Sequence, residues 1–331
     1  MPVETEASLS NALRKLLLSL GIKNVNMSAL LNAVTNNDVE TIARLLGITG
    51  AAFSDTLQRI TNIYVQSGQT LLGSAPASLV GEVSFGLASP KALSYVSQKS
   101  STLVKGISDE QRSVIRKVLN DAYLKGSGPK SAVKVLAGTK GSAGTRGGSI
   151  IGLSENQAEW VLNAREDLSR IHESQEALDR YLSRKRRDKR FDAAIKKAFA
   201  QGTPLKRDAI DKIAGRYTDR LLAYRAEVIA RTEFKEATNK ARIDAALDLV
   251  EAGKVSEDQV MKEWDSTGDR KVRSSHVAMD GQRVPLNEAF TTPDGYKLKH
   301  PGDTSLGAPA SETIQCRCVM KIKINFYKGL R

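Results

Sequence analysis

The segment 208–253 constrains the fold of this 331-residue chain more than any other stretch, because it carries the strongest helical periodicity and ends at Gly253. The chain then changes character: Gly, Pro, Asp and Thr cluster, and short apolar runs near Val284, near Phe290 and over 316–326 predict strands. We therefore expect a mainly α fold with a small α+β module at the C-terminus.

The sequence before this segment also predicts helices, with residues 73–90 as a linker. Ser108 with Gln111, and Ser154 with Gln157, have the spacing of a capping box and predict two helix starts, the second opening one or two long helices. Three regions follow: an N-terminal helical region (1–105), a central helical body with basic segments (106–255) and a β-rich module (256–331).

Positive charge is concentrated outside the first hundred residues. The chain has 50 Lys and Arg against 37 Asp and Glu, a net charge of +13, but residues 1–100 hold only 7 of the basic and 6 of the acidic residues. This excess predicts a polyanion or an acidic protein surface as a partner. The densest basic run is predicted to contact phosphates, with a solvated surface as the alternative; it consists of Arg184, Lys185, Arg186, Arg187, Lys189 and Arg190.

Four metal-binding residue types gather in the C-terminal module. The only two cysteines are Cys316 and Cys318, and two of the three histidines are His276 and His300. Two thiolates and two imidazoles suit tetrahedral zinc, and residues i and i+2 of a strand share a face. We expect a structural zinc whose closed shell leaves no open position for catalysis; the alternative is two buried thiols and two hydrogen-bonded histidines.

Several motifs in this half of the chain occur in a familiar order. They are "RAEVIARTEFKEATNKAR", "EWDSTGDRKVRSSHVAMDGQRVPLNEAF", "PDGYKLKHPGD" and "GAPASETIQCRCV". Over roughly 150–320 the chain resembles the phage Mu F-like minor head proteins, also called head morphogenesis proteins. The resemblance implies zinc ligands at His276, His300, Cys316 and Cys318. It departs at Gln315, where the family usually has Asn.

Five further motif residues are expected to be structural. Arg231 and Glu233 are two positions apart and so do not share a helix face, and we expect them to lock their helix onto the C-terminal module. Asn239 lies on the same helix. Asp269 and Arg273 are expected to hold a turn and hairpin by salt bridges rather than to act in catalysis.

The resemblance implies a minor structural protein in the head of a tailed double-stranded DNA phage, near the portal, that aids head assembly and genome packaging or delivery. Expected partners are the portal protein, the major capsid or scaffold protein, and packaged DNA bound without sequence preference. We expect the virion as its location, with the host cytoplasm during assembly. No apolar stretch approaches 18 residues, so no membrane partner is expected. We do not expect an enzyme; the alternatives are a metal-dependent enzyme or toxin acting on nucleic acid or host protein, and a zinc-containing DNA-binding regulator.

Overall fold

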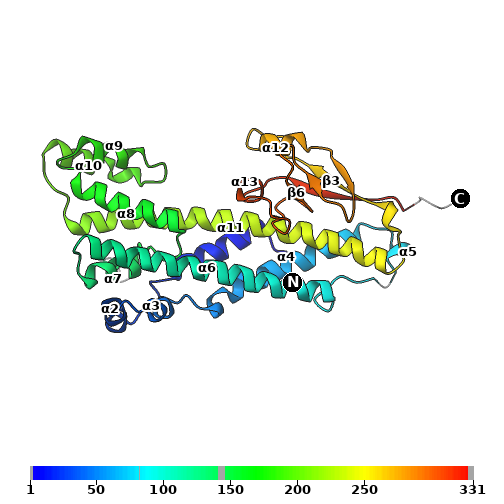
Figure 1. Ribbon diagram of the computed structural model, residues 1–331, viewed down its shortest axis with the longest axis horizontal. Helices are drawn as coiled ribbons and strands as arrows, with labels where there is room; N and C mark the ends of the chain where they lie inside the picture. The colour runs from blue at the N-terminus through cyan, green and yellow to red at the C-terminus, as the bar shows by residue number, and fades with distance from the viewer. Residues whose placement is uncertain (1–2, 82, 141–145, 327–331) are drawn as a thin grey trace. The chain divides into compact units, whose positions relative to one another are not determined.

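The structure is a computed structural model that describes residues 3–81, 83–140 and 146–326. Long helices make up most of it, and short antiparallel strands follow near the C-terminus (Figure 1). This confirms the predicted fold class, mainly α with a small α+β C-terminal module. Among the described helices, none combines the length and the apolar character that a membrane span requires.

Contacts group the chain into two compact units, each built from separated segments. Unit 1 comprises residues 1–11, 55–101 and 228–331, and unit 2 comprises residues 12–54 and 102–227. Three helices divide substantially between the units: α1 (Glu6–Ser19), α6 (Pro90–Leu124) and α11 (Arg207–Glu251). Ser54, the first residue of α4, is also assigned to unit 2, while the rest of that helix is in unit 1. The three regions expected from the sequence are consecutive along the chain. They differ from these units, because each unit consists of segments that are separated in the sequence.

Unit 2 is helical apart from one short hairpin. Its remaining elements are α2 (Met27–Thr35), α3 (Val39–Leu45), η1 (Gly50–Phe53), α7 (Pro129–Ala137), β1 (Thr139–Lys140), β2 (Arg146–Gly147), α8 (Glu155–Arg170), α9 (Gln175–Ser183), η2 (Lys189–Phe191) and α10 (Asp192–Ala200).

The predicted helix start at Ser108 is wrong, because α6 begins at Pro90 and passes through this position. Proline suits the first turn of a helix, where its missing N–H costs nothing. Gln111 is fully buried and has another role: its amide donates to the carbonyl of Leu153 at 2.9 Å and accepts from the N–H of Gly152 at 2.6 Å. The capping-box spacing here therefore reflects a side chain that holds a loop.

The second predicted helix start is confirmed. Ser154 and Gln157 form a reciprocal capping box at the start of α8. The expected one or two long helices are instead three, because Ser174 caps α9 and Asp188 caps the turn before α10. Both residues accept backbone N–H groups, as capping side chains do at helix starts.

Unit 1 combines helices with the C-terminal strands. Its remaining elements are α4 (Ser54–Gly73), α5 (Ala77–Val80), η3 (Glu257–Gln259), β3 (Val260–Asp265), α12 (Ser274–Ala278), β4 (Arg283–Pro285), β5 (Phe290–Thr291), β6 (Lys297–Leu298), α13 (Ala310–Thr313) and β7 (Val319–Ile324).

Buried polar contacts join α4 and α6 to the second half of α11 within unit 1. The hydroxyl of Tyr64 donates to Asp244 at 2.6 Å, and that of Tyr95 donates to Glu236 at 2.7 Å. The two tyrosine rings stack with centroids 4.2 Å apart. Hydrogen bonds from buried hydroxyls to carboxylates are stronger than bonds between neutral groups, so these contacts fix the helices against each other.

The C-terminal module is a three-stranded antiparallel sheet, in the order β4-β3-β7, with a small β5–β6 hairpin beside it. Burial alternates along β3, where Val260, Lys262 and Trp264 face inward. The buried ammonium of Lys262 donates to the carbonyls of Glu288 at 2.6 Å and Lys299 at 2.9 Å. In Figure 1 this orange and red module lies against the yellow half of α11.

Candidate metal centre

Three side chains of the C-terminal module converge on one buried point. His276 lies in the single-turn helix α12, and Cys316 and Cys318 lie in the extended segment between α13 and β7. Because β7 pairs with β3, Trp264 of β3 comes beside this point and contacts the His276 ring edge-on, with centroids 5.1 Å apart. The sheet thus brings together residues 40 positions apart in the sequence.

The donor atoms are close enough to share one ion. Nδ1 of His276 lies 3.5 Å from Sγ of Cys316 and 3.6 Å from Sγ of Cys318, and the three donor atoms lie within 4.8 Å of one another. The residues are at most 1% exposed. A compact group of buried N and S donor atoms fits a soft divalent ion.

The two thiols do not share the same protonation tendency. The hydrogen bond with Cys318, together with the neighbouring His276, lowers the pKa of Cys316 against the opposing effect of burial. The hydrogen bond with Cys316 and burial both raise the pKa of Cys318. Cys316 is therefore the thiol that ionises more readily of the two.

A carboxylate supports the histidine from the other side of its ring. Nε2 of His276 lies 2.9 Å from Oε2 of Glu312, although this contact does not have the angles of a hydrogen bond. Glu312 is nearly buried and accepts a hydrogen bond from the Ser275 hydroxyl at 3.0 Å. A carboxylate at Nε2 favours the tautomer that leaves Nδ1 free to bind a metal. Nothing in the sequence marks Glu312 as part of this site, because a single acidic residue four positions before a cysteine is common.

The sequence predicted His300 as a fourth ligand, but the structure does not bring it together with the other three. His300 lies outside the cluster, and its Nδ1 lies 3.2 Å from the carbonyl of Pro301. Burial lowers the pKa of His300 and keeps its imidazole neutral. Nearby, Asp303 accepts the N–H of Lys299 at 2.8 Å, so His300 lies in a hydrogen-bonded turn. This arrangement agrees with the alternative stated from the sequence, in which the histidine is hydrogen-bonded within the protein.

The described residues therefore supply three donors where the sequence predicted four. Structural zinc sites have four protein ligands, whereas catalytic sites have three and a water. The donor types fit zinc, but the fourth position must be filled by water or by a group outside this set. Four protein ligands, as predicted from the sequence, would leave no open coordination position, which excluded catalysis. With three donors this argument no longer holds.

Arg231 and Glu233 do not lock α11 onto the C-terminal module as predicted. Arg231 pairs with Glu6 of α1 at 2.9 Å, and Glu233 pairs with Lys99 of α6 at 2.6 Å. Burial raises the pKa of Glu233, and Lys99 partly offsets this effect. Both motif residues instead tie α11 to N-terminal helices of unit 1.

Other residues of α11 hold the module. Asn239 donates to the carbonyl of Pro301 at 3.0 Å, and Arg242 donates to that of Met320 at 3.1 Å. The hydroxyl of Thr232 accepts the N–H of Gln315 at 3.2 Å, next to Cys316. Sequence reasoning missed Thr232 and Arg242, since nothing in their local pattern distinguishes them from other helical residues.

Asp269 and Arg273 both make contacts in the turn before α12, but only Asp269 forms a salt bridge with another described residue. Asp269 pairs with Arg317 at 2.5 Å and caps the N–H of Lys271 at 2.8 Å. Arg273 donates to the carbonyl of Ile314. These contacts connect the turn to the segment that carries the cysteines, so they are structural.

The basic run 184–190 is not a free patch of charge. Arg184 pairs with Asp167 at 2.5 Å and Arg187 with Asp192 at 2.8 Å, while Arg190 pairs with the buried Asp188 at 2.6 Å.

Arg186 lies 3.5 Å above the Tyr224 ring. Lys185 and Lys189 are exposed and form no ion pair with a described residue. The run is a turn between α9 and α10, and three of its four arginines pair with acidic residues, two of which lie outside the run. This weakens the prediction that it contacts phosphates.

Fold and site together define a mainly helical protein with a small sheet module that holds a buried His/Cys/Cys cluster. Residues 189–321, which include α11 and this module, match the family model described as Phage Mu protein F like protein. This part of the chain is thus similar to the phage Mu F-like proteins, in agreement with the motifs noted in the sequence. Comparisons with curated proteins and with solved structures find no match. The family suggests a role in phage head morphogenesis and a location in the virion.

Proposed function

We propose that this protein is a minor structural component of the head of a tailed double-stranded DNA phage, close to the portal, that aids head assembly and genome packaging or delivery. The observation that carries the proposal is the family match over 189–321. The positive charge supports a position facing packaged DNA, which would be contacted through phosphates without sequence preference. Portal and coat or scaffold proteins are the partners that such a position requires.

The experiment is a composition analysis of procapsids and virions, from the phage or prophage that encodes this chain, with and without the gene. We expect the protein in both particles at a few copies per head, and heads without packaged DNA when the gene is deleted. Complementation with the intact gene should restore packaging. Absence of the protein from both particles would overturn the proposal.

We further propose that His276, Cys316 and Cys318 hold zinc with a structural role. The ion would tie α12 to the segment before β7, and in a small module such a link contributes folding free energy directly. The test is metal content by mass spectrometry for the wild type and for Cys316→Ser with Cys318→Ser. We expect about one zinc per chain, lost in the double variant together with thermal stability. A folded wild type without metal refutes the site.

One observation favours a second candidate, a metal-dependent enzyme: a three-donor site leaves a coordination position for water. Against it, the donors are at most 1% exposed, which leaves a substrate little access. We therefore propose a protein that is not an enzyme. Hydrolysis of DNA or RNA by the zinc-loaded wild type, abolished in the His276→Ala variant, would reverse this choice.

A further inference from the structure

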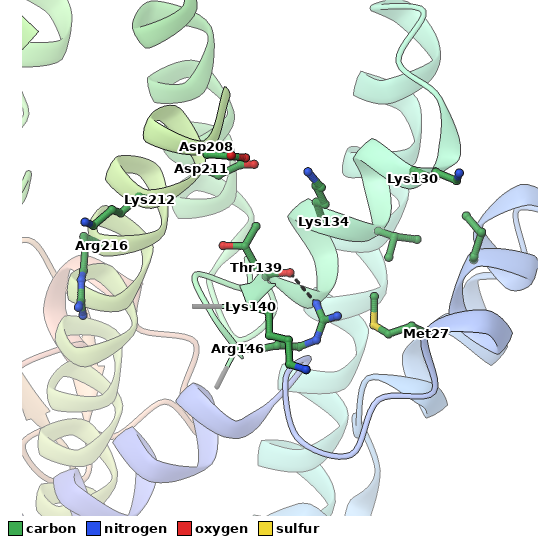
Figure 2. Close-up of a pocket in the computed structure, with 13 residues that line it drawn as sticks. Met27, Lys130, Lys134, Thr139, Lys140, Arg146, Asp208, Asp211, Lys212 and Arg216 are labelled. Atoms are coloured by element: carbon green, nitrogen blue, oxygen red, sulfur yellow. Dashed lines mark hydrogen bonds between the residues drawn. The ribbon is translucent and has the colours of Figure 1, made fainter. Parts of the chain in front are cut away.

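A cavity of about 870 Å³ in unit 2 has six basic residues among the thirteen that line it. Figure 2 shows its lining from α7, from the β1–β2 hairpin and from the first turns of α11. Two carboxylates, Asp208 and Asp211, share this lining with six basic side chains: Lys130, Lys134, Lys140, Arg146, Lys212 and Arg216. We call these six the pocket cations.

The pocket cations are poorly neutralised by the protein itself. Asp211 already pairs with Arg165 at 2.5 Å, and Arg165 is not part of the lining. The four pocket lysines form no ion pair with any described residue, and Arg216 comes only within 3.8 Å of Asp219. All four lysines and Arg216 are exposed. In the run 184–190, by contrast, three of the four arginines have acidic partners.

Their spacing makes this arrangement unfavourable without a counter-anion. Lys130 and Lys134 are four residues apart on α7, and so are Lys212 and Arg216 on α11, so each pair shares a helix face at a rise of about 6 Å. Like charges at this spacing destabilise a helix. A bound anion would remove that repulsion on both helices.

The hairpin that carries Lys140 and Arg146 is held rigidly beside α11. Arg146 donates to the carbonyl of Gly138 at 2.9 Å, a bond drawn in Figure 2. Gly148 packs so closely on α11 that a Cβ there would lie 2.5 Å from Cα of Gly215. The backbone of Gly148 also has φ +75°, which favours glycine. Lys140 and Arg146 therefore lie on a hairpin whose backbone packs closely against α11.

The charge extends beyond one cavity. A neighbouring hollow of about 680 Å³ shares Lys140 and Arg146 and adds Lys15 and Lys23. A single small anion cannot neutralise cations spread over α1, α7, α11 and the hairpin, whereas a polymer with repeated phosphates can. We infer that this pocket, and not the run 184–190, binds the phosphodiester backbone of nucleic acid without reading its sequence. This inference rests on the DNA contact in the proposed function and identifies the residues that would make that contact.

The test is the salt dependence of binding to a 20-base-pair DNA duplex, measured by fluorescence anisotropy with the full chain between about 50 and 200 mM salt. The variants are Lys130→Gln with Lys134→Gln, and Lys212→Gln with Arg216→Gln. The matched control, Lys185→Gln with Lys189→Gln, removes the same charge from the run.

Each pocket variant should reduce the slope of log affinity against log salt by about two, and weaken binding roughly 10- to 100-fold at 0.1 M salt, for any duplex sequence. The control should keep the wild-type slope. Circular dichroism checks folding, and the pocket variants should be at least as stable as wild type because like charges are removed.

Unchanged slopes in both pocket variants, or an equal loss in the control, would overturn the inference while leaving the DNA contact intact. Saturable binding of inorganic phosphate by a wild type that ignores DNA would make this a small-anion site, again against the inference. A wild type that binds neither refutes the pocket and the DNA contact together. The head-protein role would still be decided separately, by particle composition.

Discussion

Replacing Glu312 by Gln tests how the metal centre is built. This change keeps the shape of the side chain but removes the negative charge 2.9 Å from Nε2 of His276. Losing such a supporting carboxylate typically lowers metal affinity 10- to 100-fold, about 1.4 to 2.7 kcal/mol. The Glu312 side chain is only 9% exposed and is oriented by Ser275, so we expect a loss in the upper half of that range, roughly 30- to 100-fold.

Zinc affinity would be measured at pH 7.5 by competition with a chromophoric chelator, for wild type, Glu312→Gln and a matched control. The control is Glu263→Gln, on β3 of the same module, whose side chain is 13% exposed and pairs with Arg283 at 2.6 Å. It should bind zinc as the wild type does. The reasoning is refuted if Glu312→Gln stays within about threefold of wild type, or if both Glu variants lose affinity equally.

Three further variants test packing and charge in unit 1 and its module. Tyr64→Phe removes the 2.6 Å bond to buried Asp244 and should lower the free energy of unfolding by about 1.5 to 3 kcal/mol, while Tyr123→Phe, at an 83% exposed position, should change it little. Gln315 has a φ of +56°, which Asn tolerates better, so Gln315→Asn should raise thermal stability by up to about 1 kcal/mol. Burial lowers the pKa of Lys262 to about 8 in the folded protein. Between about pH 8 and 10 the unfolded chain therefore binds more protons at this residue than the folded protein does, so the free energy of unfolding of the wild type should rise with pH. Chemical denaturation at both pH values should show that Lys262→Met removes this rise.

The sequence led to the His/Cys/Cys cluster because cysteine and histidine are scarce in this chain. Only two cysteines exist, and with His276 they were brought together by the fold as predicted. It could not separate His276 from His300, since both lie in loop-rich sequence and only the sheet decides which one faces the sulfurs. Periodicity predicted that the body of the chain is helical, but it did not predict where each helix begins and ends. For example, α6 begins at Pro90 and continues through Ser108, where the sequence predicted a helix start.

Charge was the least predictable property, because pairing depends on distant residues. The run 184–190 is dense in sequence, yet Asp167 lies 17 positions before Arg184 and neutralises it. The pocket cations, in contrast, come from separate segments between Lys130 and Arg216, so their proximity cannot be seen in the sequence. A basic run in sequence therefore locates charge along the chain without telling whether that charge is available.

The contacts of α11 bear on whether the family-matched region folds alone. Within unit 1 this helix meets the C-terminal module through Asn239, but Glu233 and Asp244 bond to Lys99 and Tyr64, outside the match. An isolated helix is marginal in water, and most helical stability comes from packing. A fragment of residues 189–331 should therefore lose the amide hydrogen-exchange protection that residues 228–251 have in the full chain. Retained protection in the fragment, measured by mass spectrometry under the same conditions, would show that the module alone suffices to hold α11 and that the N-terminal contacts are dispensable.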